Sequence, residues 1–188
     1  MYKKNNIDIS REAAILLYYG IISNTMNLKI KLTSSKDIEM ANWLHNKIPE
    51  INDDITNEIV EKKSMIGDTL REEMEVEFKD QFMSISWSMG QLEVANVDKF
   101  LEKYEQDIRS ILNQVSKEND VEYISVNCMD VINGYCVIIA KDEKVAKLIS
   151  DATGIKFKNL KARVNKLLSR KEIVKILREL YHNKKEVI

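Results

Sequence analysis

A change of hydrophobic period divides this chain into two parts. Met83, Ile85, Trp87 and Met89 alternate with serines, which is the pattern of a strand with one buried face. Before that point the apolar residues recur at spacings of three and four, which predicts helices. The sequence therefore predicts an α/β protein: an N-terminal helical segment, then a compact α/β domain with a mixed β-sheet flanked by helices.

Two helices are expected in the N-terminal part. The first follows Ser10, a favourable N-cap, and is so apolar from Ala13 to Ile22 that we expect it to be buried on most sides. The second is expected to open at Ser35 and to end at Pro49, the only proline of the chain. We expect this helical part to cover residues 1–62.

The segment 63–67 is the expected linker between the two parts. It follows the helical pattern and contains Gly67, the only glycine between positions 21 and 89. The second domain is then expected over residues 68–188.

Five strands are expected in the second domain. Gly90 is predicted to turn the chain between a strand at 83–89 and another at 91–97, after which Asp98 caps a long helix. Asn133-Gly134 is a strong hairpin signal between two β-rich runs, 122–129 and 135–140. The expected elements after the hairpin are a helix from Asp142 to Gly154, a short strand at 155–160 and a helix at 169–181.

Composition excludes several classes of protein. The chain has 29 Lys and Arg against 30 Asp and Glu, whereas a general nucleic-acid binder carries a basic excess. No apolar run approaches the roughly 20 residues of a membrane span. Two cysteines, Cys128 and Cys136, and two histidines, His45 and His182, make neither a disulfide scaffold nor a convincing zinc site. We expect no nucleic-acid or membrane partner and a cytoplasmic location.

Among the residues, the clearest candidate for chemistry is Ser169-Arg170-Lys171. A guanidinium can bind two oxygens of a phosphate in a fork, and the adjacent ammonium adds a second cation. Taken alone, such a triplet is also typical of a solvated helix start. Lys79, taken alone, is typical of a surface charge.

Three segments in order resemble one known family. Ile21-Ile22-Ser23-Asn24-Thr25-Met26-Asn27-Leu28-Lys29, Gly90-Gln91-Leu92-Glu93-Val94-Ala95-Asn96 and Leu168-Ser169-Arg170-Lys171 are similar to segments of the manganese-dependent (family II) inorganic pyrophosphatases. These enzymes belong to the Asp-His-His (DHH) phosphoesterases. The resemblance is to the C-terminal part of such a protein, without most of its N-terminal catalytic domain.

The resemblance implies roles for individual residues. In that family the N-terminal domain supplies the metal ligands and the C-terminal domain supplies cations that hold pyrophosphate. By position, Arg170 and Lys171 would bind the phosphate, and Lys79 would match a further substrate lysine. Mn²⁺ or Mg²⁺ would serve the complete enzyme, but no metal is expected in this chain alone.

Two departures bear on catalysis. The family's His-x-x-x-Asp-x-Asp and Asp-His-His motifs are absent, and Asn24 stands where the family has a metal-binding Asp. An amide carbonyl is a poorer ligand for a dication than a carboxylate, and without metal there is no activated water. We therefore expect a pyrophosphate-binding part that is catalytically incomplete alone and assign it no catalytic residue. Whether the chain is an enzyme stays open.

Two other readings also stay open. The chain is either completed by a partner that supplies the metal-binding domain, or it is a non-catalytic module that binds phosphate, polyphosphate, a nucleotide or another protein. Asn24 favours the second reading. The apolar helix at 13–22 is also suited to pairing with a second copy in a homodimer.

Overall fold

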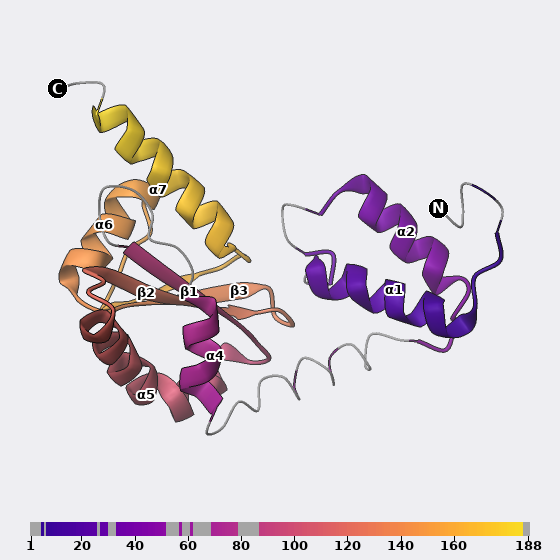
Figure 1. Ribbon diagram of the computed structural model, residues 1–188, viewed down its shortest axis with the longest axis horizontal. Helices are drawn as coiled ribbons and strands as arrows, with labels where there is room; N and C mark the ends of the chain where they lie inside the picture. Colours follow the sequence, from indigo (N-terminus) through magenta and orange to yellow (C-terminus); the bar gives the residue numbers. More distant parts are fainter. Residues whose placement is uncertain are drawn as a thin grey trace. The chain divides into compact units, whose positions relative to one another are not determined.

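The computed structural model divides the chain into two compact units, Met1–Ile59 and Val60–Ile188, each described by itself below (Figure 1). The structure describes residues 5, 7–25, 27–29, 33–51, 57, 61, 69–78 and 87–185. The expected linker at 63–67 lies outside these described residues. No helix among them is both long and apolar enough to span a membrane.

The N-terminal unit is built on two helices, α1 (Arg11–Asn24) and α2 (Ser35–His45). The Ser10 hydroxyl accepts the Ala13 N–H at 3.2 Å, which confirms the expected N-cap. Both helices and the turns after α2 contribute to one small apolar core. Its buried members are Ala14, Tyr18, Ile22, Ala41, Leu44, Ile48 and Ile51.

Two expectations for this unit were wrong. Leu16 and Leu17 of α1 are 73% and 46% exposed, so the helix is not buried on most sides. The helix α2 begins at Ser35, as expected, but it ends at His45 and not at Pro49. Its N-cap is Ser34, whose hydroxyl accepts the Asp37 N–H at 3.2 Å, and Asp37 accepts the Ser34 N–H at 2.8 Å. This reciprocal capping box satisfies amides at the start of the helix and fixes where it begins.

The C-terminal unit contains a four-stranded sheet in the order β1 (Trp87–Val94), β2 (Tyr123–Asp130), β3 (Tyr135–Ala140) and β4 (Lys161–Val164). β1 runs parallel to β2, whereas β2–β3 and β3–β4 are antiparallel. The expected mixed sheet is thereby confirmed. So is the hairpin, because Gly134 adopts φ 79° in the turn between β2 and β3.

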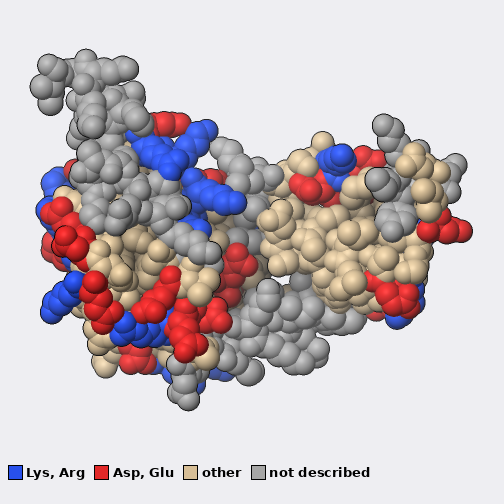
Figure 2. Space-filling model, viewed as in Figure 1, with Lys and Arg blue, Asp and Glu red and all other residues tan. Residues whose placement is uncertain are grey.

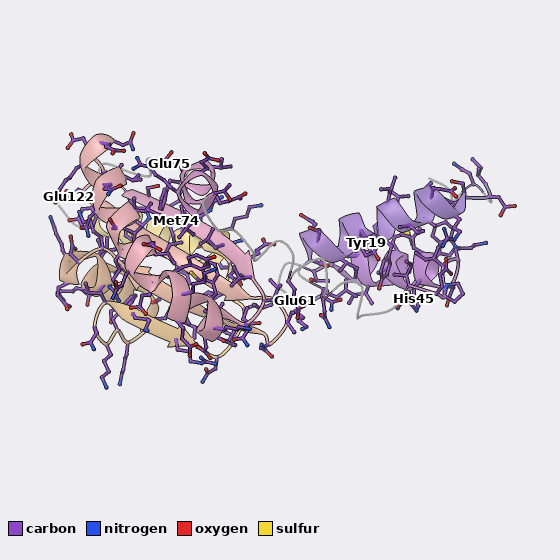
Figure 3. All side chains as sticks on the ribbon, turned by 90° about the horizontal axis from the view of Figure 1, so that it is seen from below. Tyr19, His45, Glu61, Met74, Glu75 and Glu122 are labelled. Carbon is purple, nitrogen blue, oxygen red and sulfur yellow. The ribbon has the colours of Figure 1, made fainter. Side chains whose placement is uncertain are left out.

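Helices cover both faces of this sheet. In Figure 1, α4 (Leu70–Glu77) and α5 (Val97–Glu118) lie on one face, and α6 (Glu143–Thr153) and α7 (Arg170–Lys185) lie on the other. Met74 points from α4 into the unit and is fully buried (Figure 3). The parallel β1–β2 connection passes through α5, which is the usual crossover.

Gly90 does not turn the chain, as the sequence predicted, but lies in the middle of β1. A Cβ atom at this position would lie 2.9 Å from Cε1 of the Phe78 ring. Glycine is required here by the close approach of an aromatic ring and not by a turn. Of the strand predicted at 91–97, residues 91–94 are consequently the second half of β1, and Val97 already begins the next helix. The predicted residues 83–86 lie outside the described part.

Two further boundaries differ from the prediction. The helix after β1 is capped by Asn96, which accepts the Lys99 N–H at 3.1 Å, and not by Asp98. The strand expected at 155–160 is instead β4, because Asn159 and Leu160 adopt left-handed φ angles of 52° and 61° and reverse the chain there.

Candidate functional site

The Ser-Arg-Lys triplet forms the start of α7. The Ser169 hydroxyl accepts the Glu172 N–H at 3.3 Å, and the Glu172 carboxylate accepts the Ser169 N–H at 2.9 Å. This capping box fixes the first turn and places Arg170 as the first residue of the helix. The interpretation as a helix start is therefore correct, and it is compatible with a binding role for the side chains.

Arg170 is held against strand β1. Its backbone N–H donates to Gln91 Oε1 at 2.8 Å, and its guanidinium Nη1 donates to the Met89 carbonyl at 3.3 Å. The residue is only half-buried. One guanidinium nitrogen thus contacts the strand.

Strand β2 holds Leu168, two residues before Arg170, in place. Asn127 is fully buried, and its Nδ2 donates to the Leu168 carbonyl at 2.7 Å. Asn127 pairs in register with Gln91 of the parallel strand β1. Two side-chain amides from neighbouring strands therefore hold the backbone on either side of Ser169.

Lys171 follows on the exposed side of the helix start. Its side chain forms no ion pair with any described residue. Figure 2 shows further Lys and Arg side chains gathered over α7. The start of α7 thus presents a fixed guanidinium and an exposed ammonium, which is a suitable pair for a phosphate group.

Lys79 lies outside the described residues, but its neighbour Phe78 is described. Phe78 packs its ring on Gly90, between Met89 and Gln91, the two residues that bind Arg170. Phe78 and the start of α7 therefore both contact one short stretch of β1.

A hollow with a volume of about 620 Å³ lies beside the edge strand β4. Most of its charges neutralise each other: Arg163 binds Asp98 through contacts of 2.8 and 2.9 Å, and Lys161 binds Glu105 at 2.7 Å. This hollow is a weaker anion site than the start of α7, because its acidic wall repels a phosphate.

The two cysteines are not nucleophiles. Burial raises the pKa of Cys128 to about 12 and that of Cys136 to about 11, so neither forms a thiolate at neutral pH. His45, at the end of α2, is half-buried against Tyr18 with 5.8 Å between ring centroids (Figure 3).

No family model matches the sequence. A curated relative from Clostridium acetobutylicum, described as a probable manganese-dependent inorganic pyrophosphatase, is 27% identical over 177 residues, which cover 93% of this chain and 56% of the relative. The chain resembles the manganese-dependent inorganic pyrophosphatases. It spans little more than half the length of this relative, which fits the expected correspondence to a C-terminal part.

Solved structures agree with this resemblance at the level of the fold. A candidate family II inorganic pyrophosphatase from Methanococcus jannaschii superposes with a TM-score of 0.78 at 24% identity, covering 96% of this chain and 62% of that one. An exopolyphosphatase-related protein from Bacteroides fragilis, with 15% identity, covers 95% of this chain and 52% of that one at a TM-score of 0.42. The latter likeness is too weak to bear on fold or function.

The pyrophosphatase-like segment around Asn24 forms a helix end. Asn24 is the last residue of α1 and is exposed. Thr25 donates its hydroxyl to the Ile21 carbonyl at 2.6 Å and accepts the Leu28 N–H at 3.1 Å. The segment thus forms a capped turn in which Asn24 offers one neutral amide.

The described residues do not fit a manganese site. They contain no group of three or more His, Cys, Asp and Glu side chains placed to hold a metal ion. Asp37 is engaged in its capping box, where hydrogen bonds from the Ser34 side chain and backbone lower the pKa of its carboxyl. We therefore derive no metal-dependent step for this part of the chain.

Sequence reasoning did not single out Gln91 and Asn127 as functional residues. Both are polar residues at positions of β1 and β2 whose side chains face α7. The signal that points to them is an uncharged amide within each strand, because an amide removed from water needs a specific partner.

Proposed function

We propose that this chain is the pyrophosphate-binding part of a manganese-dependent inorganic pyrophosphatase-like hydrolase. Arg170 and Lys171 bind the phosphate oxygens, and Lys79 contributes a third cation. The observation that supports this most is the attachment of Arg170 to β1 at the start of α7, within a segment that resembles the family's phosphate-binding motif.

The geometry suits an anion with several oxygens. The Arg170 backbone and one of its guanidinium nitrogens are bound to β1, so binding costs less side-chain entropy than it would for a free arginine. A phosphoryl group can accept hydrogen bonds from the Arg170 guanidinium, and Lys171 can neutralise a further negative charge. Pyrophosphate offers both groups in one molecule.

Catalysis by this chain alone is not part of the proposal. Hydrolysis in the family needs metal ions that activate water and polarise the phosphoryl oxygens, and the described residues do not form such a site. We propose that a metal-binding domain, on a partner chain or a second subunit, completes the enzyme in the cytoplasm, where the free thiols of Cys128 and Cys136 remain reduced.

Calorimetric titration of pyrophosphate into the full chain tests the assignment of Arg170. Replacing Arg170 with Ala should weaken binding at least about tenfold, the loss expected for one charge-assisted contact. Lys156→Ala removes an exposed cation elsewhere in the unit and should leave the affinity within about twofold. Equal effects of the two substitutions would remove the role assigned to Arg170.

A second candidate function is a non-catalytic sensor of phosphate, polyphosphate or a nucleotide. Asn24 favours it, since a hydrolase of this family is expected to keep a carboxylate at that position. Binding of a polyphosphate or a nucleotide at least about tenfold tighter than pyrophosphate would support this alternative.

A further inference from the structure

We infer that Gln91 is a positioning residue that holds the Arg170 backbone in place at the start of α7 through an uncharged hydrogen bond. This inference rests on the proposed function, because it concerns the same phosphate-binding arginine. It adds a residue on β1, 79 positions away in sequence, whose side chain determines how the arginine is presented.

The first step of the argument is the place of Gln91 at the helix start. The amides of the first turn of a helix lack partners within the helix. At α7 the Ser169 and Glu172 amides are satisfied by the capping box, and the Arg170 amide is satisfied by Gln91 Oε1 at 2.8 Å. Gln91 therefore holds the backbone from which the Arg170 side chain projects.

The second step is the orientation of the Gln91 amide itself. Its Nε2 donates to Glu93 Oε1 at 3.3 Å. This contact turns the carbonyl oxygen of Gln91, and not its NH₂ group, toward the Arg170 N–H. The adjacent Met89 carbonyl accepts from Nη1 of the same arginine at 3.3 Å. Alternate residues of β1 thus hold both ends of Arg170.

The third step concerns charge. A Glu side chain at position 91 has the same shape and could accept the same hydrogen bond from Arg170. It would also place a negative charge against the Arg170 backbone N–H, at the start of α7, and this charge would repel an incoming phosphate. The neutral amide of Gln91 holds the Arg170 backbone without adding a negative charge to the helix start.

Two substitutions separate these effects in the full chain. Gln91→Glu should weaken pyrophosphate binding about tenfold through its charge. Gln91→Leu removes the acceptor without adding charge and should weaken binding about fivefold, the equivalent of one lost hydrogen bond. Gln106→Glu, an exposed position on α5, is the matched charge control and should leave the affinity within about twofold.

A double-mutant cycle distinguishes positioning from a general structural role. If Gln91 acts through Arg170, Gln91→Leu has no further effect on affinity in an Arg170→Ala background. A fivefold loss in both backgrounds would overturn the inference while leaving the phosphate-binding role of Arg170 intact.

A ligand-free measurement keeps the inference testable on its own. In ¹H–¹⁵N NMR spectra, the Arg170 backbone amide should exchange with solvent at least about tenfold faster in Gln91→Leu than in the wild type, and amides of the α5 core should not change. Unchanged exchange would show that Gln91 does not hold Arg170. A wild-type chain that binds no pyrophosphate would instead refute the proposed function, and the NMR result would still decide the contact.

Discussion

Asp130 provides the strongest test of how the C-terminal unit is held together. Its carboxylate lies at the end of β2 with 0% exposure. It accepts the Val97 N–H at 2.9 Å, the Asn133 N–H at 2.7 Å and the Asn133 Nδ2–H at 3.0 Å. One side chain thus caps helix α5 and closes the β2–β3 turn.

The expected cost of removing this carboxylate follows from these contacts. Asp130→Ala leaves the buried Val97 N–H without an acceptor, which costs about 1–3 kcal/mol, and it removes two bonds in the partly buried turn at about 0.5–1.5 kcal/mol each. We expect the free energy of unfolding to fall by about 2–6 kcal/mol in total. Asp130→Asn keeps one carbonyl acceptor and should cost about half as much.

Urea unfolding of this unit alone can be followed by fluorescence. The chain has two tryptophans, Trp43 in the N-terminal unit and Trp87 in β1, so a Trp43→Phe background makes Trp87 the single reporter of the C-terminal unit. Asp107→Ala, an exposed position on α5, is the matched control and should change stability by less than about 0.5 kcal/mol. An Asp130→Ala variant as stable as this control would refute the reasoning.

Two other predictions concern Gly90 and Asp98. Gly90→Val should lower the free energy of unfolding by about 1–3 kcal/mol, because the Cβ of the new side chain would meet the Phe78 ring at 2.9 Å. In the urea assay, the same substitution should cost less in a Phe78→Ala background. Equal costs in the two backgrounds would contradict the contact. The hydrogen bond from Arg163 lowers the pKa of Asp98, so this pair stabilises the fold at neutral pH and loses its effect as pH falls through the folded-state pKa. Arg163→Met should return the Asp98 pKa toward its ordinary value in an NMR titration, and an unchanged pKa would show that Arg163 is not the cause.

Local patterns in the sequence were sufficient to predict the architecture. The Asn133-Gly134 hairpin, the glycine that ends α6 and the helix that starts beside Ser169 all depend on neighbouring residues, and the structure confirms them. Gly90 misled the prediction because a glycine can serve either a turn or a close approach. Only the distant Phe78 ring decides between them.

Only part of the candidate site could be predicted from local sequence patterns. Arg170 and Lys171 stand together in the sequence and could be found by motif. Their supports could not, because Gln91 and Asn127 contact the segment across 79 and 41 positions of the chain. Contacts of this range depend on the register of β1 against β2, which no local pattern specifies.

One experiment tests the central claim most directly: pyrophosphate is titrated into the purified full chain in the presence of a chelator, and phosphate release is then measured with excess Mn²⁺ and with Mg²⁺. The account predicts binding without metal that depends on Arg170, and no release of phosphate by the chain alone. Metal-dependent turnover, or the absence of any pyrophosphate binding, would contradict it.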